Sequence, residues 1–126
     1  MVKFTIPLQP RTKKTSQRIV TVHGRPMVIP SKQYKQYEAD CMPFMPNPKF
    51  IDFPINIKAV FYMKTRRKVD LTNLQQALND ILVKYGIIED DNNRIVVSMD
   101  GSRVKYDKDN PRTEVEITPY EEENEQ

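Results

Sequence analysis

The chain has 126 residues, a length that predicts one domain. Its apolar fraction of 38% is ordinary for a soluble chain, and no apolar run approaches the roughly 18 residues that mark a transmembrane helix. We therefore predict a cytoplasmic protein without a membrane span, because the first ten residues also lack the layout of a signal peptide. The single cysteine excludes an internal disulfide, and with the single histidine it makes neither a zinc site nor a convincing nucleophile and base.

The two signs of charge are segregated along the chain. Residues 1–69 hold 14 Lys and Arg against 3 Asp and Glu, whereas residues 70–126 hold 6 against 14. A metal-dependent nuclease needs such an arrangement, because cations hold the phosphodiester backbone while carboxylates hold a metal ion. The competing interpretation is uneven surface charge with an acidic tail, since four glutamates after residue 120 supply half of the acidic excess. Composition alone therefore favours nucleic-acid binding only modestly.

The first part of the chain is predicted to contain a strand, a basic loop and a hairpin. Residues 2–6 alternate as in a half-buried strand. Residues 11–18 are polar and cationic without an apolar period, which predicts a loop. Lys13 and Lys14 in this loop are candidates for phosphate contacts, and a solvated loop without a ligand is an equal alternative. Apolar segments within residues 19–29 flank a glycine turn with an exposed histidine, and they predict a short hairpin.

A helix that contains tyrosines is predicted next. Ser31 can cap a helix that continues to about Met42. Tyr34, Tyr37 and Cys41 share one face, which predicts core packing, with DNA contact by the tyrosines as the alternative. Cys41 is therefore predicted to be a small buried residue.

The middle of the chain combines a strand, a basic run and a second helix. Residues 53–63 alternate and predict a strand that leads into the basic run 64–68. Apolar residues at three- and four-residue spacing predict an amphipathic helix over residues 71–85, which Gly86 ends. Three cations of the basic run are candidates for phosphate contacts: Arg66, Arg67 and Lys68.

Acidic residues stand at both ends of this second helix. Asp70 precedes the first turn, where exposed amides keep a carboxylate charged and able to bind a hard cation. Thr72 and Gln75 match the capping-box pattern. If the chain turns back along the helix, a carboxylate from residues 89–91 comes close to Asp70 and makes a magnesium site. Without that return the two ends stay roughly 20 Å apart.

The remaining elements complete a single small domain. We predict a strand over residues 94–99, and a hairpin in which residues 103–106 pair with residues 112–118. The element order gives an α+β domain, with a mixed sheet carrying two helices over residues 1–120. An acidic C-terminal tail follows at residues 121–126.

The acidic motif resembles a known family. The run Asp70-Leu71-Thr72-Asn73-Leu74-Gln75, followed by Asp80, Gly86 and the pair Asp90-Asp91, resembles the RusA family of Holliday-junction resolvases, strongly over residues 66–97 and loosely elsewhere. The resemblance implies a RusA-like fold, a homodimer, and magnesium-dependent cleavage of DNA four-way junctions. It matches Asp70 and Asp91 to the family's metal-binding aspartates. We predict that Asp90 completes the metal shell or orients water.

Two positions depart from the family pattern. Thr72 stands where a second aspartate is typical, and Gln76 stands where the family carries a functional lysine. The loss of one negative charge predicts weaker magnesium binding, and Thr72 is predicted to cap the helix. Asp80 is a candidate substitute ligand, because it shares a polar helix stripe with Asn73 and Gln76. Asn73 is a candidate to orient a ligand or a phosphate, and the alternative for the whole stripe is a solvated helix face.

These observations predict an endodeoxyribonuclease that uses Mg²⁺, with Mn²⁺ as an alternative ion, and resolves four-way junctions by paired nicks. No small-molecule cofactor is predicted. The first alternative is a protein of the same fold that binds branched nucleic acid but cuts poorly, because of Thr72 and Gln76. A structural subunit that binds no nucleic acid is the third interpretation.

Overall fold

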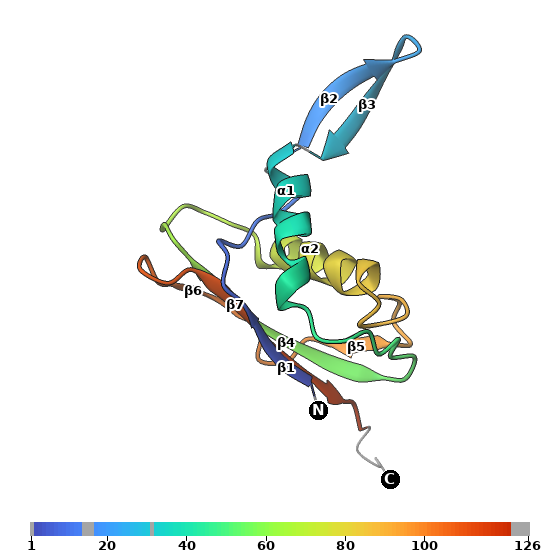
Figure 1. The fold of residues 1–126 in the computed structure, drawn as a ribbon, viewed down its shortest axis with the longest axis vertical. Coiled ribbons are helices and arrows are strands. Elements are labelled where there is room, and N and C mark those ends of the chain that lie inside the picture. The colour runs from blue at the N-terminus through green and yellow to red at the C-terminus, as the bar shows by residue number, and fades with distance from the viewer. Residues whose placement is uncertain (1, 14–16, 31, 122–126) are drawn as a thin grey trace.

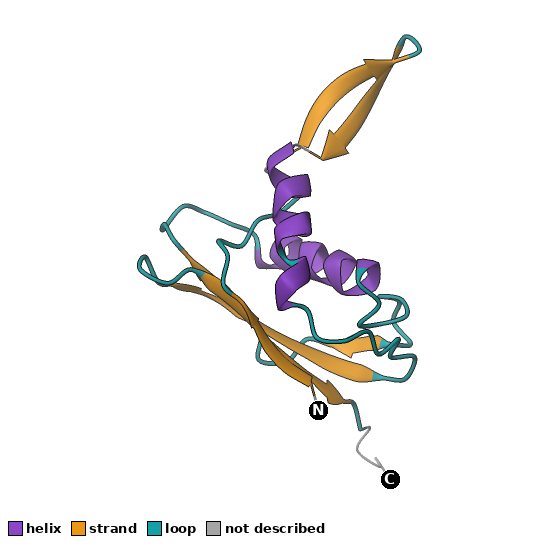
Figure 2. Ribbon diagram, in the orientation of Figure 1, coloured by secondary structure: helices purple, strands orange, loops and turns teal. Residues whose placement is uncertain are grey.

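The computed structural model describes residues 2–13, 17–30 and 32–121. Two helices cover one face of a five-stranded sheet, and a two-stranded hairpin stands apart from it (Figures 1 and 2). This confirms the predicted α+β class with a mixed sheet and two helices. The elements in chain order are β1 (Val2–Ile6), β2 (Gln17–Val22), β3 (Arg25–Pro30), α1 (Lys32–Asp40), β4 (Ile55–Met63), α2 (Leu71–Lys84), β5 (Val96–Ser98), β6 (Arg103–Tyr106) and β7 (Arg112–Pro119).

Strand β4 is the centre of the sheet. Its alternate residues from Ile55 to Met63 are buried beneath the helices, as the period of two predicts. Along one edge β4 pairs antiparallel with β7, from Ile55 opposite Pro119 to Tyr62 opposite Arg112. Along the other edge it pairs parallel with β5 near its start and with β6 near its end. Strand β1 pairs antiparallel with β7 and closes that side of the sheet.

The predicted hairpin of residues 103–106 and 112–118 is wrong. Strands β6 and β7 do not pair with each other, because β4 lies between them and pairs with both. The buried strand β4 needs partners on both edges, whereas all four residues of β6 are exposed. The connection from β6 to β7 therefore crosses the end of β4, where the amide of Asp107 donates to the carbonyl oxygen of Met63 at 2.9 Å.

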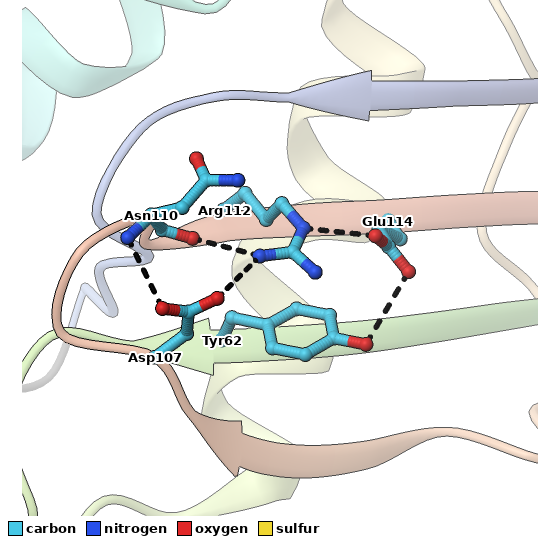
Figure 3. A network of polar contacts seen from close by, with 5 residues as sticks. All are labelled: Tyr62, Asp107, Asn110, Arg112 and Glu114. Atoms are coloured by element: carbon cyan, nitrogen blue, oxygen red, sulfur yellow. Dashed lines mark hydrogen bonds and ion pairs between the residues drawn. The ribbon is translucent and has the colours of Figure 1, made fainter.

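Arg112 holds this crossing loop in place (Figure 3). Its guanidinium donates to the carboxylate of Asp107 and to the carbonyl oxygen of Asn110, both at 2.9 Å, and to Glu114 at 2.8 Å. The guanidinium also stacks 3.7 Å from the centre of the Tyr62 ring on β4. The hydrogen bond from Arg112 lowers the pKa of Asp107. The loop is thus tied to β7, which follows it, and to β4, whose end it crosses.

The helices bury the residues that their spacing predicts. In α2 the buried face includes Leu74, Leu78, Ile81 and Leu82, and in α1 it includes both tyrosines. Cys41 is fully buried, and this burial raises the pKa of its thiol to about 11, which confirms its structural role. Helix α1 ends at residue 40 and a 3-10 turn follows, because a proline within the turn removes an amide donor. None of the helices in the described ranges is long and apolar enough to cross a bilayer.

Helix α2 ends at its C-terminus as predicted, but its N-terminal capping differs from the prediction. Asp70 is the N-cap, and its carboxylate accepts from the amide of Thr72 at 3.1 Å. The predicted capping box is therefore wrong: Thr72 lies inside the helix, and Gln75 lies too far along it to reach back and is buried instead. Gly86, with φ of +70°, ends the helix as predicted.

Candidate functional site

The chain turns back after α2, and Asp91 on the returning segment senses the negative charge of Asp80. The amide of Ile51 donates to the carbonyl oxygen of Ile87 at 3.1 Å, and the amide of Glu89 donates to the carbonyl oxygen of Ile51 at 2.9 Å, so the return is anchored on both sides. Partial burial raises the pKa of Asp91, and the negative charges of Asp80 and Asp90 raise it further. Two of the predicted carboxylates thus lie within electrostatic reach of each other beside α2.

Lys13, in the loop after β1, forms an ion pair with Asp80. Its Nζ lies 2.7 Å from Oδ2 of Asp80 and 5.7 Å from the centre of the Tyr34 ring. The two side chains of the ion pair are 36% and 30% exposed, so the pair contributes about 0–1 kcal/mol to stability. Lys13 was predicted as a phosphate contact, and the structure places it at the carboxylate of Asp80. Lys14, its predicted companion, lies outside the described residues.

Asp90 shapes the turn that presents Asp91. Its carboxylate accepts from the side-chain amide of Asn92 at 2.9 Å and from the backbone amide of Asp91 at 2.8 Å. The bond from Asn92, together with that from the Asp91 amide, lowers the pKa of Asp90. Asn92 in turn accepts from the amide of Arg94 at 2.9 Å. The loop after α2 is therefore built from its own polar side chains.

Asp70 stands at the other end of the helix from this pair. Besides the Thr72 amide, its carboxylate accepts a hydrogen bond from the Thr72 hydroxyl at 2.6 Å. Ten residues separate Asp70 from Asp80, which is about 15 Å along a helix axis. One magnesium ion, with ligands at about 2.1 Å, is too small to be held directly by both. Among the described residues, no three His, Cys, Asp or Glu side chains gather closely enough to hold a metal ion.

The donor chemistry nevertheless fits a hard cation. Magnesium is usually bound by one or two carboxylates, with waters and substrate phosphate oxygens completing the shell, rather than by a cage made only of protein. Asp91 and its neighbour Asp80 supply two carboxylates whose mutual repulsion a divalent cation would relieve. Gln76 is exposed one helical turn before Asp80, and Asn73, one turn earlier, is half-buried.

A basic cavity of about 270 Å³ adjoins the start of α2. Three cations line it, namely Arg11 from the loop after β1 and Arg67 and Lys68 from the loop before α2. The cavity also contains Thr12 and Thr65, and no carboxylate belongs to its lining. Sequence reasoning did not single out Arg11, although Arg11 stands in the cationic loop that was considered for phosphate contacts.

The basic run before α2 is divided between two places. Arg66 does not line the cavity, and its guanidinium instead lies 4.2 Å from the centre of the Tyr106 ring on β6. Arg67 and Lys68 are exposed at the cavity. Of the predicted phosphate contacts in this run, two therefore share one concave basic surface and the third lies at the edge of the sheet.

Comparison with known proteins identifies the family. The family model described as endodeoxyribonuclease RusA matches residues 7–118, which include both helices, the carboxylate pair and the basic cavity. No curated protein matches the chain. Because the family model covers most of the sequence, the chain belongs to the RusA family of endodeoxyribonucleases.

Proposed function

We propose that this protein is a magnesium-dependent endodeoxyribonuclease that resolves four-way DNA junctions by paired nicks. Family membership supplies the DNA-cleaving activity. The observation that supports metal dependence is the electrostatic coupling of Asp91 to Asp80, which itself pairs with Lys13, because two interacting carboxylates with a cation beside one of them suit both a divalent ion and a phosphate. As a homodimer, the protein would place two symmetric sites on opposing strands.

In this proposal Asp91 is the central magnesium ligand. A bound ion lowers the pKa of a coordinated water and stabilises the charge that develops on the scissile phosphate. Asp90 keeps Asp91 oriented through the turn that both residues form. Proximity favours Asp80 as the second ligand, and the family pattern favours Asp70. Their separation of about 15 Å means that only one of them shares an ion with Asp91 directly.

The same proposal assigns DNA holding to the basic cavity. Arg11, Arg67 and Lys68 would bind backbone phosphates, which position the strand without reading its sequence. Arg66 would contact a neighbouring phosphate from its place over Tyr106. Asn73 would orient a phosphate on the same helix face as Asp80.

Cleavage of a labelled synthetic four-way junction tests the function. The junction is compared with a linear duplex of the same sequence, with Mg²⁺, with Mn²⁺ and with a chelator. We expect symmetric nicking of the junction alone, and only with metal. Parallel assays of Asp70→Asn and Asp80→Asn identify the second ligand, because the variant that lacks the true ligand loses cleavage at all practical magnesium concentrations. Tight binding without cleavage in either metal would leave a junction-binding protein and refute the nuclease proposal.

Thr72→Asp is expected to lower the magnesium concentration for half-maximal cleavage by roughly tenfold. The substitution adds a carboxylate within hydrogen-bonding distance of Asp70, and added charge strengthens a hard-cation site. An acidic residue in the first turn also suits the helix dipole, so stability is retained. The measurement is a magnesium titration of the junction-cleavage rate. Thr72→Asn is the control of matched size, and equal titrations for the two variants would exclude a metal site at Asp70.

Lys13→Ala is expected to lower the single-turnover cleavage rate by roughly 10- to 100-fold, because Asp80 loses the cation that pairs with it. Stability should change by no more than about 1 kcal/mol. Adding Gln76→Lys should restore part of the rate, since a lysine at position 76 lies one helical turn from Asp80. Gln76→Met in the same background is the control. Equal rates for these two double variants would mean that the cation itself is not needed.

A further inference from the structure

The β2–β3 hairpin stands apart from the rest of the molecule. It projects beyond the start of α1, away from the sheet and from α2 (Figure 1). Its two strands pair with each other through six residue pairs and belong to no other sheet. Residues 21–27 are all exposed, including Val22 at 39% and Met27 at 48%. An isolated two-stranded hairpin is only marginally stable in water, and a partner that covered this one would stabilise it.

Charge indicates the chemistry of that partner. Residues 1–37 carry eight Lys and Arg and no Asp or Glu, and the first carboxylate of the chain is Glu38. The hairpin itself contains Arg18 and Arg25, and Arg25 is exposed beside the turn. A projecting element with cations and no carboxylate attracts a polyanion. A second copy of the same arm would bring uncompensated like charges together, which disfavours a contact between two arms.

Residues that precede and follow the hairpin in sequence line the basic cavity. The segment that leads into β2 supplies Arg11 and Thr12 to the cavity lining, and the first turn of α1, directly after β3, supplies Gln33. A DNA strand held there by phosphate contacts would therefore begin at the base of the hairpin. Each strand of the hairpin has six residues, about 20 Å, and a two-stranded ribbon fits a major groove about 12 Å wide.

We propose that the β2–β3 hairpin is a DNA-binding arm that lies in the groove of one duplex arm of the junction. The inference deepens the proposed function and rests on it for the identity of the substrate. The arm extends the binding surface beyond the cavity and away from the carboxylates. It therefore contributes to affinity and to the placement of the junction, and not to the chemical step.

The test removes the arm and measures binding without cleavage. In one variant, residues 19–28 are replaced by three glycines, and in a second Arg25→Ala removes one cation. Lys3→Ala is the matched control, because Lys3 is an exposed cation on the sheet face opposite the helices. Fluorescence anisotropy with a labelled four-way junction in chelator gives the Kd at several salt concentrations. Sedimentation velocity gives the oligomeric state, and a thermal melt followed by circular dichroism reports folding.

For the variant without the arm we expect binding to be roughly tenfold weaker or more. We also expect a shallower slope of log K against log salt concentration, because the slope decreases in magnitude by about 0.9 for each phosphate contact removed. Arg25→Ala should weaken binding severalfold, and Lys3→Ala should not. The melting temperature, the oligomeric state and the single-turnover cleavage rate at saturating protein should be unchanged. Unchanged affinity in the arm-less variant would overturn the proposal. Loss of the oligomer together with loss of binding would also overturn it, and would make the hairpin a contact between two copies.

Failure of the arm and failure of the proposed function are distinguishable. If the wild-type protein binds the junction through the arm but does not cut it in either metal, the nuclease proposal fails and the arm stands. If the wild-type protein cuts the junction and the arm-less variant binds it equally well, the arm fails and the nuclease proposal stands.

Discussion

Asp91→Asn is expected to leave junction binding intact while magnesium-dependent cleavage falls by roughly a thousandfold, the upper range for loss of one group that stabilises a transition state. The amide has nearly the shape of the carboxylate but lacks the charge that holds a divalent cation. The candidate ligand pairs are Asp91 with Asp80 and Asp91 with Asp70. Because Asp91 belongs to both pairs, only a substitution of Asp91 disrupts both. Because the change also relieves repulsion with Asp80, folding should not suffer.

The measurement is single-turnover cleavage of the labelled junction, together with a binding isotherm in chelator. Asp109→Asn is the matched control, since Asp109 is an exposed carboxylate in the loop between β6 and β7. If Asp91→Asn cleaved the junction at the rate of this control, Asp91 would not be a metal ligand. Loss of binding as well as cleavage would show that the side chain supports the structure of the loop.

Leu82→Ala is expected to lower the free energy of unfolding by about 3 kcal/mol. Leu82 is fully buried on the face of α2 that belongs to the hydrophobic core, and truncating such a residue costs about 2–5 kcal/mol through lost burial and the cavity left behind. Urea denaturation followed by circular dichroism measures the change. Gln76→Ala is the control on the same helix, where an exposed position should shift stability by less than about 0.5 kcal/mol.

A loss near 3 kcal/mol would also reduce cleavage at raised temperature, because α2 carries both Asp70 and Asp80 and must be folded to present them. At low temperature, where the variant remains folded, the cleavage rate should equal that of the wild type. A stability change below about 1 kcal/mol would mean that the core around Leu82 repacks or that α2 contributes little to the cooperative unit.

Local patterns predicted the parts of the fold that depend on nearby residues. The spacing of Leu74, Leu78 and Ile81 predicted the buried face of α2, and Gly86 predicted its end. The alternation in β4 predicted its burial. Such signals work because side-chain direction repeats with the backbone period, whatever the element packs against.

Long-range pairing escaped prediction. Residues 103–106 and 112–118 look like a hairpin because they are close in sequence, yet β4 separates them through contacts to residues about 40 to 60 positions away. The contact of Lys13 with Asp80 and the convergence of Arg11 with Arg67 likewise join distant segments. The acidic residues Asp70 and Asp91 could be identified from the sequence. The distances between the acidic residues could not be predicted, because they depend on how the chain turns back after α2.

The pairing of β1 with β7 also has a consequence for how the protein folds. Val2 lies opposite Ile117, so two strands from opposite ends of the chain must meet before the sheet is complete. Contacts of such large sequence separation raise the contact order and slow folding. During synthesis, β4 and α2 emerge from the ribosome long before β7, and the long edge of β4 stays unpaired until residues 112–119 follow. The sheet is therefore complete only after residues 112–119 have been synthesised.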